Sequence, residues 1–152
     1  MKEFTREQIS RLAALVESDR FSTGQSNREL HRHDISPHYG TLPAGIIWPT
    51  STDEVADSLS WCYENDVPVT PRGAGTSTEG NPVPTCGGLV INMSRMDKIL
   101  EIRPGDLQVD VQPGVLRKEL NRKAGRHGLF FHQIRGRTTP LDSKIWKAHP
   151  ER

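Results

Sequence analysis

Residues 67–80 read Val-Pro-Val-Thr-Pro-Arg-Gly-Ala-Gly-Thr-Ser-Thr-Glu-Gly. A short β-branched run ends at Pro71, and a loop rich in glycine and hydroxyl side chains follows, opened by Arg72. Glycine lets backbone N–H groups approach an anion because no Cβ stands in the way. Hydroxyl donors at residues 76–78 and the positive charge of Arg72 add to this capacity. The loop therefore predicts a pyrophosphate site, and with it a dinucleotide cofactor.

The loop matches neither of two common phosphate-binding motifs. A Walker loop ends in Gly-Lys followed by Ser or Thr, and this loop contains no lysine. Gly73 and Gly75 could open a Rossmann fingerprint, but the next glycine, Gly80, comes two positions late. Pro82 and Pro84 then prevent the helix that the fingerprint requires. From the loop chemistry alone, an ordinary surface loop is the alternative interpretation.

Motifs on both sides of the loop decide between these interpretations. Residues 43–49 read Pro-Ala-Gly-Ile-Ile-Trp-Pro, residues 87–96 Gly-Gly-Leu-Val-Ile-Asn-Met-Ser-Arg-Met, residues 109–115 Val-Asp-Val-Gln-Pro-Gly-Val, and residues 128–131 Gly-Leu-Phe-Phe. In this order and spacing, the set resembles the FAD-linked oxidase family with the vanillyl-alcohol-oxidase (PCMH-type) FAD-binding domain. The likeness is greatest to the D-lactate dehydrogenases and the flavin subunit of glycolate oxidase, and it covers residues 34–131.

The resemblance implies FAD as the cofactor and a small D-2-hydroxy acid, of the lactate or glycolate type, as the substrate of the complete family member. In that family the FAD pyrophosphate lies against the loop after the second strand, and the turn at residues 113–115 lies near the same cofactor. Catalytic residues belong to a later cap domain, so the resemblance implies none here. The cofactor-binding residues carried over are Pro71, Arg72, Gly73, Ala74, Gly75, Thr76, Ser77, Glu79 and Gly80.

Composition narrows the function further. The chain has 152 residues, 34% hydrophobic and 26% charged, which predicts one polar domain with a modest core. The net charge of +1 gives no basic footprint for nucleic acid. No apolar run is long enough to span a membrane, and the N-terminus lacks a signal-peptide core. We therefore expect a cytoplasmic protein, with peripheral membrane association left open.

Two groups of side chains could carry other chemistry. Cys62 and Cys86 form no metal or redox motif, and Cys62 reads as a small core residue on a helix. The histidines His31, His33 and His38 are close enough in sequence to suggest a metal site. A structural zinc site needs four ligands, and no cysteine or carboxylate completes the set at useful spacing, so structural roles are favoured.

Local signals predict the helices. Thr5 with Gln8 forms a capping box that begins a helix over residues 5–18, and residues 21–39, without a clear period, read as loop. Ser51 with Glu54 begins a second helix. The buried face of that helix is expected to carry Val55, Leu59, Cys62 and Tyr63, and the last helix Leu116, Leu120 and Ala124, ending near Gly128.

Strands are expected at residues 46–48, 67–70 and 89–92, and an antiparallel pair at 99–102 and 108–112. The fold class is therefore mixed α/β (α+β), a PCMH-type FAD-binding fold, truncated, of small mixed sheets with flanking helices. The predicted division is an N-terminal helix and loop over residues 1–40, a partial FAD-binding domain over 41–131, and a tail over 132–152.

The tail departs from the family. After Gly-Leu-Phe-Phe the family continues Pro-Pro-Asp-Pro-Gly-Ala-Asp, whereas this chain has His-Gln-Ile-Arg-Gly-Arg-Thr. Synonymous codons exist for residues 131–140 that, read from the third base of the Phe131 codon, restore the family segment. Our hypothesis is a frameshifted tail, with genuine divergence as the alternative. Three interpretations stay open: part of an FAD-dependent enzyme, a non-catalytic remnant, or a flavin-binding module that needs a separate cap chain.

Overall fold

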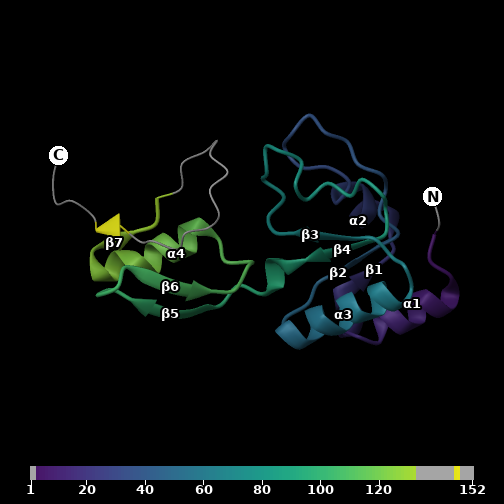
Figure 1. The fold of residues 1–152 in the computed structure, drawn as a ribbon. Coiled ribbons are helices and arrows are strands. Elements are labelled where there is room, and N and C mark those ends of the chain that lie inside the picture. The colour runs from purple at the N-terminus through teal and green to yellow at the C-terminus, as the bar shows by residue number, and fades with distance from the viewer. Residues whose placement is uncertain (1–2, 133–145, 148–152) are drawn as a thin grey trace. The chain divides into compact units, whose positions relative to one another are not determined.

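The structure, a computed structural model, describes residues 3–132 together with the backbone of residues 146–147. The chain forms two compact units, residues 1–96 and 97–152 (Figure 1). The first unit holds a four-stranded sheet and the glycine loop, and the second holds a β-hairpin that packs on a helix. The division predicted at residues 40 and 131 stays a prediction.

The sheet of the first unit has the strand order β1-β2-β4-β3. Its strands are β1 (Phe21–Ser22), β2 (Gly45–Ile47), β3 (Val69–Arg72) and β4 (Leu89–Asn92). β1 is antiparallel to β2, whereas β2, β4 and β3 run parallel. Every residue of β2 and β4 is buried, as expected of parallel strands that are covered on both faces. The register places Arg72 beside Asn92 at the carboxyl ends of β3 and β4.

Helices cover the two faces of this sheet (Figure 1). The helices α1 (Arg6–Ala13) and α3 (Thr52–Glu64) pack on the face that carries Leu89 and Ile91. Side chains alternate along a strand, so Val90, Asn92 and the register partner Arg72 belong to the opposite face. That face carries the short helix α2 (Gln25–Leu30), because His31 at its carboxyl end contacts Asn92.

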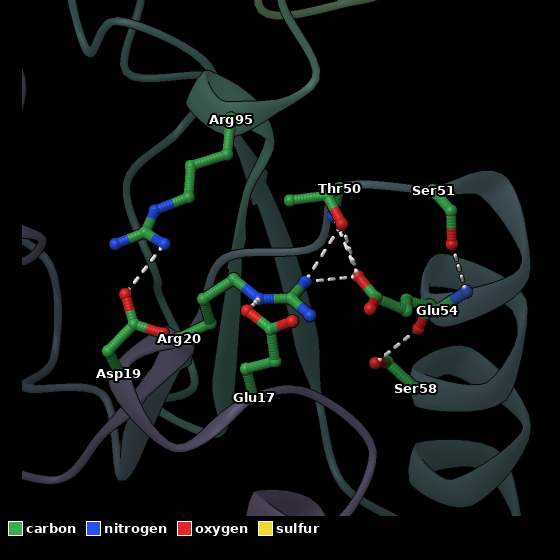
Figure 2. A network of polar contacts seen from close by, with 8 residues as sticks. All are labelled: Glu17, Asp19, Arg20, Thr50, Ser51, Glu54, Ser58 and Arg95. Atoms are coloured by element: carbon green, nitrogen blue, oxygen red, sulfur yellow. Dashed lines mark hydrogen bonds and ion pairs between the residues drawn. The ribbon is translucent and has the colours of Figure 1, made fainter.

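A polar network ties the N-terminal segment to α3 (Figure 2). Arg20 is 5% exposed and donates from Nη1 to a carboxylate oxygen of Glu54 at 2.5 Å and to the Thr50 hydroxyl at 3.0 Å. The same carboxylate accepts from the Thr50 backbone N–H, while the Ser51 hydroxyl caps the helix by accepting from the Glu54 N–H. Arg20 holds the pKa of Glu54 down to about 2, against burial, which raises it. Glu54 therefore serves as an ion-pair partner rather than as the reciprocal half of the predicted capping box.

The predicted buried face of α3 is wrong in part. Leu59 is 46% exposed and Tyr63 is 88% exposed, whereas the side chains that are buried are Ser58, Trp61 and Cys62. A polar Ser58 can occupy the core because its hydroxyl donates to the Glu54 carbonyl at 2.6 Å. Both sets of residues fit a helical period, and the large Trp61 ring, in edge contact with Phe4, selects the observed one.

The N-terminal predictions are also corrected. Thr5 and Gln8 form the predicted capping box, but α1 ends at Ala13 rather than Ser18, and a separate 3₁₀ turn (η1, Ser18–Arg20) follows after four intervening residues. The predicted loop over residues 21–39 contains β1 and α2. The sequence of α2 shows no helical spacing of apolar residues, because the buried residue of this helix is Arg28. The Arg28 Nε donates to the Pro43 carbonyl at 2.6 Å. Long-range hydrogen bonds, rather than local pattern, stabilise this helix.

The strand predictions are confirmed with small shifts. β4 has the predicted bounds, β2 lies one residue nearer the N-terminus than predicted, and β3 lies two residues nearer the C-terminus, so that it ends at Arg72. In the second unit, β5 (Ile99–Arg103) and β6 (Gln108–Val111) form the predicted antiparallel pair. Helix α4 (Arg117–Ala124) buries Leu120 and Ala124 as predicted. Leu116 is instead the exposed N-cap residue, and the 3₁₀ turn η3 (Gly125–His127) ends the helix at a left-handed Gly128.

The core of the second unit lies between the hairpin and α4. Val109, Leu120, Ala124 and Leu129 form its buried cluster. The Asn121 side chain joins α4 to the segment after β7 (Leu129–Phe130), since it donates to the Phe131 carbonyl at 3.2 Å and accepts from the Phe131 N–H at 2.6 Å. The short strands β7 and β8 (Trp146–Lys147) pair antiparallel. Apart from β8, the predicted tail beyond His132 lies outside the described residues. Across the described residues, no helix is long and apolar enough to cross a membrane.

The two cysteines should differ in reactivity. Cys62 is 1% exposed, and burial raises the pKa of its thiol to about 11, whereas Cys86 is exposed. We expect one thiol per chain to react rapidly with a disulfide reagent at pH 8, and the second to react only in denaturant. Cys86→Ser should remove the fast phase. Two equally fast thiols in the native protein would contradict this placement of Cys62.

Candidate functional site

The predicted phosphate loop begins where β3 ends. Residues 73–80 leave the sheet after Arg72, at the edge where the carboxyl ends of the parallel strands β2, β4 and β3 lie together. In open α/β sheets, ligands bind outside the carboxyl ends of such strands. A second loop, residues 31–40, leaves the carboxyl end of α2 and lies beside the first, and Figure 1 shows both above the sheet. These two loops form the candidate site.

Arg72 lies beneath the glycine loop rather than extending from it. Its side chain donates from Nη1 to the His33 carbonyl at 2.9 Å and from Nη2 to the Leu30 carbonyl at 3.4 Å. Arg72 is only 8% exposed, and burial lowers the pKa of its guanidinium while the charge of Asp34 opposes the shift. The guanidinium also meets the carbonyl end of α2, where a positive charge is favourable. Arg72 thus joins the second loop to β3, a role that sequence reasoning missed.

Two glycines in the loop have conformations that a larger residue would strain. Gly75 has φ +71°, and a methyl group there would lie 2.6 Å from Arg72 Cζ. Gly80 has φ +74°, and a methyl group there would lie 2.9 Å from the His38 ring. Gly73 differs, since nothing described lies within 4 Å of the corresponding position. The loop therefore packs closely on Arg72 and His38 while leaving space at its opening.

The middle of the loop presents hydrogen-bond donors. Across the described residues, the backbone N–H groups of Ala74, Gly75, Thr76 and Ser77 donate to no acceptor. The Ser77 hydroxyl accepts from the Glu79 N–H at 3.2 Å. Consecutive N–H groups around a left-handed glycine form a concavity that suits an anion. Together with the hydroxyls of residues 76–78, this donor set fits a pyrophosphate.

A buried polar cluster supports the loop from below. His31 is 3% exposed, and its Nδ1 lies 2.7 Å from the Asn27 carbonyl while its Nε2 lies 2.7 Å from the Asn92 amide nitrogen. The imidazole also packs edge-on against Trp48, with ring centroids 5.6 Å apart. Burial lowers the pKa of His31, and the charge of Arg72 lowers it further, against the Asn27 hydrogen bond. Sequence reasoning did not single out Asn92, although its position at the end of a buried strand was a signal.

Hydrogen bonds join the two ends of the second loop. Arg32 donates from Nε to the Gly40 carbonyl at 2.9 Å, and the Gly40 N–H donates to the Arg32 carbonyl at 3.1 Å. Burial of Asp34 raises the pKa of its carboxyl, but hydrogen bonds from Ser36 and from the backbone N–H groups of Asp34 and Gly80 together lower it overall. His33 and His38 are exposed, so the three histidines considered for a metal do not converge. Among the described residues, no cluster of His, Cys, Asp and Glu is arranged to hold a metal ion.

The other predicted residues take simpler positions. Pro71 and Glu79 are exposed, and Ala74 and Thr76 are exposed at the middle of the loop. The turn at residues 113–115 belongs to the second unit. The structure therefore brings together the loop residues that were carried over from the resemblance, and it adds His31, Asn92 and Asp34 as their supports.

Comparison with known proteins agrees with this architecture. Residues 43–137 match the family model described as the FAD binding domain. The glycolate oxidase subunit GlcD of Bacillus subtilis is 35% identical over 127 residues, which cover 84% of this chain and 27% of that protein. The mitochondrial D-lactate dehydrogenase (cytochrome) of Arabidopsis thaliana is 35% identical over 132 residues, 86% of this chain and 23% of that protein. This chain thus spans about a quarter of the length of these relatives.

Solved structures share the fold. An alkyldihydroxyacetonephosphate synthase matches with a TM-score of 0.74 at 21% identity, over 84% of this chain and 26% of that one. p-Cresol methylhydroxylase with substrate bound matches with a TM-score of 0.71 at 18% identity, over 80% and 25%. The predicted PCMH-type fold and FAD as its cofactor are confirmed. The chain belongs to the FAD binding domain family of the FAD-linked oxidoreductases, with D-lactate dehydrogenases and glycolate oxidase subunits among its relatives.

Proposed function

We propose that the loop after β3 binds the pyrophosphate of FAD. The observation that carries this proposal is the run of backbone N–H groups from Ala74 to Ser77 that have no acceptor among the described residues. Those groups lie at the carboxyl edge of a parallel sheet, where an anion accepts from them without displacing a protein hydrogen bond. The proposed cofactor-binding set is Pro71, Arg72, Gly73, Ala74, Gly75, Thr76, Ser77, Glu79 and Gly80.

The members of this set have different tasks. Backbone N–H groups and the Thr76 and Ser77 hydroxyls donate to the phosphate oxygens. Gly73 leaves room for the phosphate to approach, since a methyl group there meets no described atom within 4 Å. Arg72 is engaged by the carbonyls of Leu30 and His33, so it holds the loop in place and contributes its charge from beneath.

We further propose that the parent protein oxidises a small D-2-hydroxy acid. The support is the family together with the names of two relatives, a glycolate oxidase subunit and a D-lactate dehydrogenase. Bound FAD supplies the redox chemistry as the acceptor of a hydride equivalent. The residues of this chain bind and orient the cofactor, and we assign none of them to catalysis. A remnant without turnover, or a flavin module that works with a separate cap chain, is the alternative.

Comparing FAD with riboflavin tests the assignment, because riboflavin lacks the phosphates. We expect the 152-residue chain to quench FAD fluorescence in a saturable titration, to bind riboflavin at least about tenfold more weakly, and to release FAD in excess ADP. Raising the salt concentration should weaken FAD binding, since the contact is with an anion. Equal affinity for riboflavin and FAD, or no competition by ADP, would contradict a pyrophosphate site.

The frameshifted tail stays a separate prediction. If the gene, read from the third base of the Phe131 codon, encodes Pro-Pro-Asp-Pro-Gly-Ala-Asp and a cap domain, the oxidoreductase activity belongs to the restored protein. If that frame encodes nothing related, the tail is divergent, and flavin binding is the function to test on this chain directly.

A further inference from the structure

The hydrogen bonds of His31 fix its protonation state. The Asn27 carbonyl can only accept, so Nδ1 carries the hydrogen that bridges the 2.7 Å distance. The Asn92 side chain is oriented by Ser94, whose N–H donates to Asn92 Oδ1 at 2.9 Å, so its NH₂ group faces His31 Nε2. Nε2 therefore accepts and carries no hydrogen. His31 is the neutral Nδ1–H tautomer, and the other tautomer or the imidazolium would place two donors face to face.

The surroundings of His31 disfavour its cationic form. Arg72 from β3 brings a positive charge, and Asn27 from α2, Asn92 from β4 and the ring of Trp48 complete the contacts. Asp34 in the second loop is the nearby carboxylate, and its charge acts on Arg72. Burial and Arg72 both lower the pKa of His31.

His31 is connected to the glycine loop through Arg72. The carbonyls that hold the guanidinium belong to Leu30 and His33, which flank His31 in the chain. Asn92 is also the register partner of Arg72 in the sheet. Gly75 packs directly on the guanidinium, so a displacement of Arg72 cannot leave the loop unchanged.

We propose that His31 is a positioning residue for the phosphate loop, effective only as the neutral Nδ1–H tautomer, so that protonation of this imidazole weakens binding of the FAD pyrophosphate. This inference rests on the proposed function of the loop. Protonation removes the acceptor for Asn92 and sets a cation beside Arg72, and the cluster that holds the loop then separates. The pyrophosphate diester stays ionised in weak acid, so its own titration does not cause the loss. If protonation of His31 acted only by adding a positive charge, it would strengthen binding of the anion. A loss of FAD affinity in acid therefore distinguishes the proposed displacement of the loop from a simple charge effect.

The first experiment needs no ligand. Nitrogen-15 NMR of the 152-residue chain should show His31 with a protonated Nδ1 and a bare Nε2 at pH 7.5. On acidification, the backbone amide signals of Gly73 and Gly75 should shift with the same midpoint as the His31 ring, below 6.5. The proposal would be overturned if the Gly73 and Gly75 amide shifts did not change with the midpoint of the His31 ring, or if His31 were an imidazolium at pH 7. Because the wild-type chain is measured, this result stands even if a variant fails to fold.

The second experiment measures affinity. As the pH falls from 7 through the His31 midpoint that NMR gives, FAD affinity should fall about fivefold or more in the wild-type chain. His31→Gln keeps an acceptor near the Nε2 position without a titrating group, and it should bind FAD with little pH dependence. His127→Gln, which changes an exposed histidine of the second unit, is the matched control and should keep the wild-type profile. Affinity that rises in acid, or identical profiles for wild type and His31→Gln, would refute the proposal. Failure to bind FAD at any pH would instead refute the proposed function and leave the NMR result to decide the role of His31.

Discussion

Glu54→Gln should lower the free energy of unfolding by about 2–4 kcal/mol, because it removes the carboxylate 2.5 Å from the buried guanidinium of Arg20 and leaves the guanidinium with the exposed Glu17 carboxylate, 3.5 Å away. The Arg20 and Glu54 side chains are 6% and 20% exposed, so solvent screens this pair far less than a surface pair. The variant also weakens the acceptor for the Thr50 N–H, next to the cap of α3. Urea denaturation at pH 7 measures the effect, with Glu64→Gln, an exposed change on the same helix, as the control.

The pH dependence of stability gives a second readout of the same pair. The pKa of Glu54 falls from 4.5 to about 2 on folding. A carboxylate with a lowered pKa stabilises the protein fully above its unfolded pKa, and this stabilisation is lost as the pH falls from 4.5 toward 2. Glu54→Gln should therefore remove part of the acid loss that the wild-type chain shows in that window. Equal stability of wild type and variant at pH 7 would contradict the network in Figure 2.

Gly75→Ala should abolish FAD binding under conditions in which the wild-type chain is saturated, a loss of at least about 100-fold in affinity. The backbone at Gly75 is left-handed, and the added methyl group would lie 2.6 Å from Arg72 Cζ, so either the loop or the guanidinium must move. Both movements displace the donor run at residues 74–77. The measurement is the FAD fluorescence titration, with circular dichroism to show that the fold persists.

Gly105→Ala is the matched control for this variant. Gly105 lies in the turn between β5 and β6, its φ is not left-handed, and no atom of the described part of the chain lies within 4 Å of the added methyl group. It should therefore bind FAD like the wild-type chain. If Gly75→Ala folds and binds FAD normally, the close packing of the loop on Arg72 does not matter for the cofactor, and the proposed site is wrong.

Local chemistry explains which features the sequence could predict. Thr5 and Ser51 cap their helices by accepting from N–H groups three residues later, and residues 89–91 are consecutive apolar residues. A few adjacent residues are therefore enough to predict each of these features. The glycine loop was readable for the same reason, since glycine spacing and hydroxyl content are properties of adjacent residues. The family resemblance then supplied FAD, which no local pattern specifies.

Long-range contacts explain what the sequence could not predict. Helix α2 forms around Arg28, whose partner carbonyl at Pro43 is fifteen residues away. The pairing of His31 with Asn92 spans sixty-one residues, so a window over either residue shows only a lone polar side chain. Arg72 looked like an anion ligand because it is next to a glycine-rich loop, whereas the alternation of side chains in β3 directs it to the carbonyls of Leu30 and His33. The alternation of side chains along β3 indicates the face on which Arg72 lies, but only once the register of the strand is known.

An NMR titration of the 152-residue chain with FAD, followed through the backbone amides, locates the bound cofactor on the chain. We predict that the largest shifts fall on Ala74, Gly75, Thr76 and Ser77, and that ADP reproduces them while riboflavin does not. Saturable FAD binding with the largest shifts elsewhere, and with residues 71–80 unaffected, would contradict this prediction.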